Sequence, residues 1–134
     1  MSVQLNQLQK NALKRIISIL NKENIEYEIV WWLAAKFYWS HRDLNDIDIN
    51  IADDGYEKIL PYIESYITIP LTYYENELWK WKELALNYEW QEFEIWLQNT
   101  TYIKNTQTWI WYTEQFDYID IDYDWILVNV QTKD

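Results

Sequence analysis

One short segment alternates strictly between polar residues and isoleucine: Asp46-Ile47-Asp48-Ile49-Asn50-Ile51. Successive side chains of a β-strand point to opposite faces of its sheet, so this pattern predicts a strand with one polar and one apolar face. The apolar face needs a cover of apolar side chains from elsewhere in the chain. The segment therefore predicts a sheet with helices laid against it.

The first half of the chain supplies candidates for that cover. Residues 3–23 are predicted to form an amphipathic helix that ends near Asn24, because apolar residues recur at spacings of three and four. A short strand, Tyr27–Val30, follows, and residues 33–38 have the composition of a helix. Asp53 or Asp54 is expected to cap a further helix, which Pro61 should kink or divide. The apolar side of the first predicted helix consists of Leu5, Leu8, Ala12, Leu13, Ile16, Ile17 and Leu20. That of the later helix consists of Ile59, Leu60 and Ile63.

The second half of the chain is predicted to consist of strands. Leu84–Tyr88 and Glu92–Leu97 are close enough in sequence to form a hairpin, and Ile126–Val130 is a last strand. The order α-β-α-β-α followed by strands is typical of an α+β domain with a twisted mixed sheet flanked by helices. The 134 residues suit one domain, spanning 1–134, and contain no repeat or linker.

Composition excludes several classes of protein. With 11 basic against 22 acidic side chains, the net charge of −11 argues against nucleic acid as a partner. No apolar run reaches the roughly 18 residues of a membrane span, and no signal peptide is recognisable at the N-terminus. The absence of cysteine excludes disulfides and thiolate metal sites. We expect a cytoplasmic domain that does not bind membranes.

Asp46 and Asp48 are the first candidates for chemistry. They lie on one face of the predicted strand, about 6.6 Å apart along the chain. Converging carboxylates of this kind suit Mg²⁺, which prefers hard oxygen ligands and substrate phosphates. The alternative is a solvated strand face without a metal ion.

The context of the two aspartates resembles the nucleotidyltransferase signature of the DNA polymerase β-like superfamily. In that family a strand ends in Gly-Gly, and a short helix, another Gly, an Arg and Asp-h-Asp-h follow, where h is apolar. Here the stretch from Ile29 to Ile49 has this layout, with Arg42 four residues before Asp46. The family's third carboxylate lies on a later strand between apolar residues, as in Phe93-Glu94-Ile95. The chain is most similar to small lincosamide and aminoglycoside nucleotidyltransferases and to uncharacterised Gly-Gly relatives.

The resemblance implies a role for each matching residue. Asp46 and Asp48 would hold Mg²⁺ on a nucleoside triphosphate, and Glu94 would be the general base, with Glu92 as a second candidate. Ser40 and Arg42 would contact phosphates, and Trp31 and Trp32 occupy the Gly-Gly position of the nucleotide site. The implied reaction transfers a nucleoside monophosphate, AMP by family habit, to a hydroxyl of a small-molecule acceptor such as an antibiotic. A homodimer or a protein partner could complete the acceptor site. The alternative is an inactive fold that acts as a partner-binding or antitoxin-like module.

Tryptophan and glycine occur in unusual numbers. Ordinary usage would give about nine glycines and about two tryptophans, whereas the chain has 1 and 10. Trp31, Trp32 and Trp39 stand at family glycine positions, and Trp90 and Trp125 stand where turns favour glycine. Our hypothesis is that several of these tryptophans represent glycines encoded by UGA, while Trp79 and Trp111 fit either identity. The alternative is a genuinely tryptophan-rich protein, and UGG codons at 31, 32 and 39 would establish it.

Overall fold

The computed structural model describes residues 6–30, 46–123 and 126–132. Several sequence predictions fall outside these residues and stay predictions: the helix at 33–38, the nucleotide contacts Trp31, Trp32, Ser40 and Arg42, and the turn at Trp125.

The N-terminal helix α1 (Gln7–Lys22) begins where Asn6 can cap it. The Asn6 side chain accepts a hydrogen bond from the Gln9 amide at 2.8 Å, and the Gln9 side chain accepts one from the Asn6 amide at 3.1 Å. This reciprocal capping box makes the helix begin at Gln7 rather than at residue 3. The helix ends close to the predicted point, since Asn24 has a φ of 54° and leaves the helical conformation.

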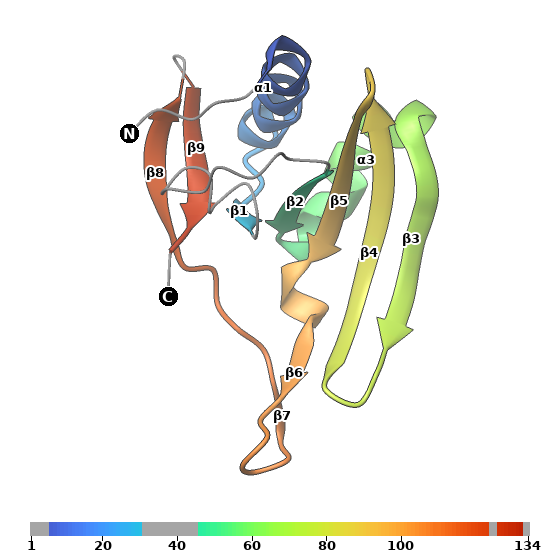
Figure 1. Cartoon of the computed structure of the whole chain (residues 1–134), viewed down its shortest axis with the longest axis vertical. Coiled ribbons are helices and arrows are strands. Elements are labelled where there is room, and N and C mark those ends of the chain that lie inside the picture. Colours follow the sequence, from blue (N-terminus) through green and yellow to red (C-terminus); the bar gives the residue numbers. More distant parts are fainter. Residues whose placement is uncertain (1–5, 31–45, 124–125, 133–134) are drawn as a thin grey trace.

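The described residues form one nine-stranded mixed sheet (Figure 1). The strand order is β7-β6-β4-β5-β2-β1-β9-β8, with β3 paired to β4. The pairs β2–β5 and β1–β9 are parallel, and the other pairs are antiparallel. The strands are β1 (Tyr27–Val30), β2 (Asp46–Ile51), β3 (Ile67–Glu75), β4 (Trp79–Tyr88), β5 (Gln91–Leu97), β6 (Tyr102–Lys104), β7 (Trp111–Tyr112), β8 (Tyr118–Tyr123) and β9 (Ile126–Gln131).

A 3₁₀ turn, η1 (Asp53–Gly55), leads into the helix α3 (Tyr56–Ile63). The expectation that Asp53 or Asp54 caps this helix is wrong, because no side chain caps α3. Asp53 instead binds the turn after β5, accepting hydrogen bonds from the Asn99 amide at 2.8 Å and the Thr100 hydroxyl at 2.7 Å. Pro61 lies inside α3 without dividing it, and a second 3₁₀ turn, η2 (Glu64–Tyr66), follows the helix.

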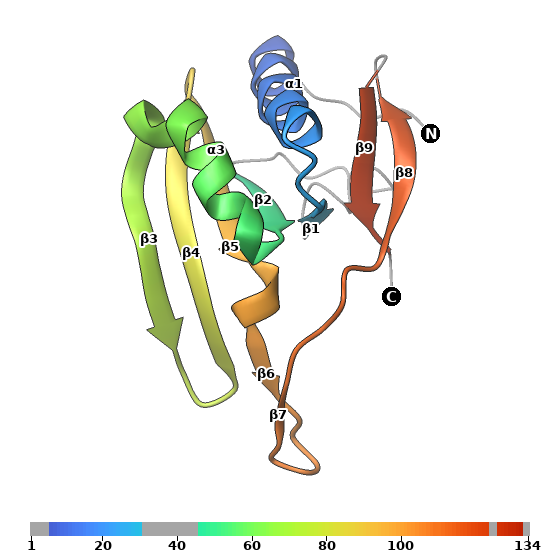
Figure 2. The same cartoon turned by 180° about the vertical axis from the view of Figure 1, so that it is seen from behind.

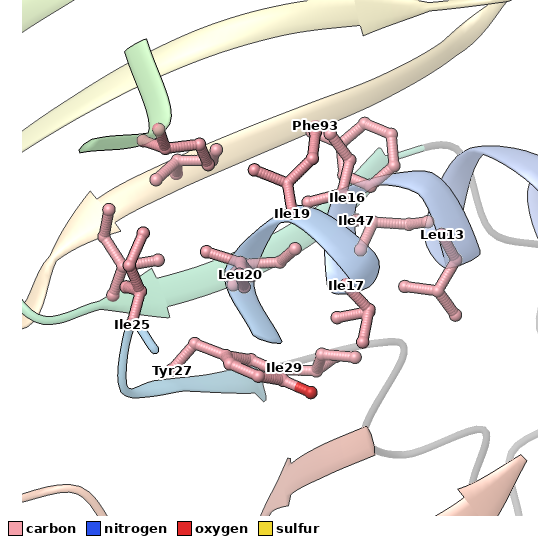
Figure 3. Packing of buried hydrophobic residues seen from close by; sticks show 14 of the residues in the cluster. Leu13, Ile16, Ile17, Ile19, Leu20, Ile25, Tyr27, Ile29, Ile47 and Phe93 are labelled. Atoms are coloured by element: carbon pink, nitrogen blue, oxygen red, sulfur yellow. The ribbon is translucent and has the colours of Figure 1, made fainter. Parts of the chain in front are cut away.

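The core lies between the helices and the isoleucine face of β2. Ile47, Ile49 and Ile51 are each 0% exposed and belong to one buried cluster with Ile59, Ile63 and most apolar residues of α1 (Figure 3). Two expected members, Leu8 and Leu60, lie outside the cluster, and Leu8 is 51% exposed. Figure 2 shows α3 in front of β2 and β5. Both described helices contribute to this single cluster, so in the described residues helices cover one face of the sheet, and the expectation of a sheet flanked by helices is met in part. The face that carries Asp46 and Asp48 is covered by no helix among the described residues.

Two tryptophans have a backbone conformation that favours glycine. The β4–β5 hairpin turns through Glu89 and Trp90, whose φ values are 48° and 74°. Positive φ at both central residues defines a type I′ turn, in which glycine is preferred at the second position. Trp109, in the turn between β6 and β7, has a φ of 59°. The side chains of Trp90 and Trp109 are 88% and 64% exposed, so burial does not offset the backbone strain.

We predict that Trp90→Gly and Trp109→Gly each raise the free energy of unfolding by about 1 kcal/mol, because glycine relieves the left-handed strain of a side chain. Trp81→Gly is the control: Trp81 has no positive φ and stacks between two other rings, so its loss should destabilise the protein. Chemical denaturation measures all three. Destabilisation by Trp90→Gly and Trp109→Gly would contradict the glycine assignment at these turns.

Candidate active site

The parallel pairing of β2 with β5 brings three carboxylates together. In the register of these strands, Asp48 lies opposite Glu94, and Asp46 lies opposite Glu92. One ligand oxygen each from Asp46, Asp48 and Glu94 lies within 4.8 Å of the other two. All three side chains are partly exposed at the polar face of the sheet. The arrangement could therefore hold a cation through three hard oxygen ligands.

Glu92, the second candidate base, does not belong to this group. It shares the face of Glu94 but is exposed. The group of three carboxylates contains Glu94 and leaves Glu92 out. The geometry therefore favours Glu94 as the residue that faces the two aspartates.

The electrostatics of the cluster favour a bound cation. Burial, together with the nearby carboxylates of Glu94 and Asp46, raises the pKa of Asp48 to about 8. The Oδ1 atom of Asp48 is buried and has no hydrogen-bond partner among the described residues. An unpaired buried carboxylate oxygen is costly, and a coordinated cation would remove both the repulsion and the missing contact. The donor set fits a hard divalent ion such as Mg²⁺.

A fourth carboxylate, Glu83 on β4, was not singled out from the sequence. Burial raises its pKa, as do the charges of Glu94 and Asp46. Its Oε1 accepts a hydrogen bond from the indole N–H of Trp81 at 2.9 Å. The position of Glu83 could have been predicted from the β4–β5 hairpin. Pairing Tyr88 with Gln91 across the turn sets Glu83 opposite Trp96, on the face of the sheet that carries Glu94.

Comparison with known proteins supports the fold. No protein-family model matches the chain, and no curated protein matches it. Among solved structures, the chain is similar to a putative nucleotidyltransferase from Thermotoga maritima, with a TM-score of 0.84 and 13% sequence identity. The likeness covers 97% of this chain and 81% of that one. The chain therefore has a nucleotidyltransferase-like fold, in agreement with the resemblance of its motif.

In the part of the chain that the structure describes, no helix is both long and apolar enough to cross a membrane.

We predict that Mg²⁺ stabilises the folded protein, because a cation that binds only the folded carboxylate cluster shifts the folding equilibrium. The free energy of unfolding should rise by about 2.7 kcal/mol at about 100 times the Kd of Mg²⁺. Thermal unfolding at pH 8.5 in Mg²⁺ or EDTA measures the effect. Asp48→Asn should melt higher than the parent in EDTA and lose the response to Mg²⁺. The control Glu77→Gln, which removes an exposed carboxylate from the β3–β4 turn, should keep the response to Mg²⁺. Equal responses to Mg²⁺ in the two variants would refute the site.

A buried glutamate on β1 adds a second electrostatic feature to the polar face. Glu28 lies opposite Asn50 of β2 and is 1% exposed. The pKa of Glu28 is raised from 4.5 to about 7, mainly by burial and also by the charges of Asp117 and Glu114. Two hydrogen bonds to Glu28 lower its pKa in part: one from the Asp117 amide, 3.4 Å from Oε2, and one with the Asn50 side chain. Glu28 therefore keeps its proton in the folded protein at pH values where the unfolded chain has lost it.

Stability should consequently fall as the pH rises from about 4.5 to about 7, the window between the unfolded and folded pKa of Glu28. Glu28→Gln keeps a hydrogen-bond acceptor and removes the titration. We predict that the variant is more stable than the parent at pH 8, by up to on the order of 3 kcal/mol, and nearly equal to it at pH 4.5. Urea denaturation at the two pH values measures this difference. A difference that does not change with pH would exclude Glu28 as its source.

Proposed function

We propose that the protein is a Mg²⁺-dependent nucleotidyltransferase that transfers a nucleoside monophosphate, AMP in the first instance, to a hydroxyl group of a small-molecule acceptor. The observation that carries this proposal is the convergence of Asp46, Asp48 and Glu94 on the polar face of a nucleotidyltransferase-like sheet. The net charge of −11 favours a small-molecule acceptor over nucleic acid. Antibiotics of the aminoglycoside and lincosamide classes are trial acceptors because of the resemblance of the motif.

In this proposal Asp46 and Asp48 hold the metal ion with the triphosphate, and Glu94 acts on the acceptor. When bound, Mg²⁺ would neutralise charge that develops on the phosphate oxygens. Glu94 accepts the proton of the acceptor hydroxyl, whose oxygen forms a bond to the α-phosphorus. The bond from that phosphorus to the bridging oxygen of the β-phosphate breaks, and pyrophosphate leaves. The β2–β5 pairing supports this role because it places all three carboxylates on one face of the sheet.

The triphosphate contacts depend on residues 31, 32 and 39, at which the family has glycine. Glycine lets backbone amides approach phosphates closely, whereas an indole there would fill the space for the triphosphate. Trp90 and Trp109 adopt backbone conformations that favour glycine, which supports the UGA hypothesis at two other positions. The hypothesis was first raised for Trp31, Trp32 and Trp39, and we propose that glycine at these positions gives the active protein.

The second candidate function is a partner-binding or antitoxin-like module without catalytic activity. It is favoured if the tryptophans at 31 and 32 are genuine, because they would block the triphosphate and offer aromatic side chains to a protein partner. The two candidates differ in one property, which is nucleotide binding.

We predict that ATP binds with a requirement for Mg²⁺ to a variant that carries glycine at 31, 32 and 39, and binds far more weakly to the chain as written. Calorimetry with ATP and GTP, in Mg²⁺ and in EDTA, measures this. No binding to either folded protein would refute the enzyme and leave the partner-binding module.

The role of Glu94 as the base is tested by pyrophosphate release in the presence of trial acceptors. Glu94→Gln should lower the rate by roughly 10²- to 10⁴-fold with nucleotide binding retained, whereas Glu92→Gln should lower it little.

A further inference from the structure

Three aromatic side chains stack in series on the polar face of the sheet. Tyr74 on β3, Trp81 on β4 and Trp96 on β5 form this aromatic ladder, across three strands that run side by side (Figure 1). The ring centroids of Tyr74 and Trp81 are 5.4 Å apart at an interplanar angle of 21°, and those of Trp81 and Trp96 are 5.4 Å apart at 11°. None of the three belongs to the buried core, and each is partly exposed.

The ladder ends beside the carboxylate cluster. Trp96 follows Glu94 by two residues on β5, so both side chains lie on the same face, about 6.6 Å apart along the strand. Glu83 connects the two groups, because it accepts the hydrogen bond of the Trp81 indole and lies in the electrostatic field of Glu94. The position of the ladder relative to Glu94 is therefore set by the β4–β5 pairing and by this hydrogen bond.

One face of the Trp96 ring stacks on Trp81, and the second face is directed away from Trp81. The ring is almost parallel to that of Trp81 on β4, and β2 lies on the other side of β5. Trp96 stands opposite Asn50 of β2 in the strand register, next to the pair formed by Asp48 and Glu94. No aromatic ring of the described residues stacks on this second face. The indole N–H of Trp96 is buried without a partner there, so stacking rather than hydrogen bonding holds the ring.

The ladder lies on the side of the cluster where the acceptor is expected. In the sequence, the proposed phosphate contacts belong to the stretch between β1 and β2. Glu94, the proposed base, lies on β5, on the side of β2 away from β1, and β4 and β3 continue in that direction. A flat ring laid against Trp96 could place a ring hydroxyl beside Glu94, because the two residues are separated by a single repeat of the strand.

We propose that the aromatic ladder is the acceptor subsite of this enzyme, and that it binds a hydroxylated ring that carries no negative charge, with Trp96 as the platform. The aromatic face favours a ring, and the carboxylates of Asp46, Asp48, Glu83 and Glu94 reject anionic groups beside it. This inference rests on the proposed function, since it assigns the acceptor side of the same site. The competing explanation is that the ladder only stabilises the sheet, as cross-strand aromatic pairs do.

The test uses the protein form that binds Mg²⁺-ATP and two matched probes, 4-nitrophenyl glucoside and 4-nitrophenyl glucuronide. Ligand-observed NMR in the presence of Mg²⁺-ATP should detect binding of the neutral glucoside and at least tenfold weaker binding of the anionic glucuronide. Trp96→Leu should weaken glucoside binding about tenfold, whereas Trp96→Tyr, which keeps a ring, should retain most of it. Trp111→Leu is the matched control, because Trp111 lies on β7, beneath the ammonium groups of Lys80 and Lys104 and outside the ladder.

Each other outcome overturns a different statement. If Mg²⁺-ATP binds but the glucoside does not, or if folded Trp96→Leu binds it like the parent, the acceptor subsite is refuted and the proposed function stands. If Trp96→Leu weakens ATP instead, the ladder serves the nucleobase, which also refutes the inference. If the glucoside binds through Trp96 while no protein form binds Mg²⁺-ATP, the proposed function fails and the ladder remains a ring-binding site. Thermal unfolding of every variant separates loss of binding from loss of fold.

Discussion

The parallel pairing of β2 with β5 is the contact on which both the core and the candidate site depend. Because side chains alternate along each strand, one register places Ile47, Ile49 and Ile51 under the helices and sets Asp48 opposite Glu94 on the other face. A slip of one residue would expose the isoleucines and bury the aspartates. The hydrophobic effect therefore determines where the carboxylates point, and the apolar face of the sheet supports the chemistry of the polar face.

The polar face holds charges that the folded chain alone does not balance. Asp46, Asp48, Glu83 and Glu94 gather there, and the pKa of Asp48 rises to about 8 because burial and its acidic neighbours disfavour its charge. Such a cluster destabilises the protein unless a cation occupies it, and natural proteins retain costs of this kind mainly at functional sites. The aromatic ladder borders the same cluster through Trp96 and Glu83, and in our proposal it binds the second ligand, the acceptor.

Backbone conformation and side-chain contacts divide five of the six described tryptophans into two groups. Trp81 and Trp96 stack in the ladder, and Trp111 lies beneath the ammonium groups of Lys80 and Lys104, so their side chains make contacts that glycine could not replace. Trp90 and Trp109 have positive φ and largely exposed side chains, so their positions suit glycine better. The turn at Trp90 was predicted from the spacing of two strands, whereas Trp109 was recognised only from its backbone. The unusual numbers of tryptophan and glycine can therefore be traced, in part, to Trp90 and Trp109.

The sequence by itself determined the strands Tyr27–Val30 and Asp46–Ile51, the amphipathic helix α1, the β4–β5 hairpin and the two aspartates, because these depend on local periodicity and on one motif. The resemblance to the family motif also indicated Glu94, which stands between two apolar residues of a strand as the third carboxylate of the family does. Only the tertiary structure decided that both described helices pack on one face, that Asp53 binds Asn99 and Thr100 instead of capping α3, and that Glu94 rather than Glu92 joins the aspartates. Glu83 and the aromatic ladder likewise required the strand order. The physical reason is that contacts between distant strands depend on register and pairing, which the local pattern of side chains does not encode.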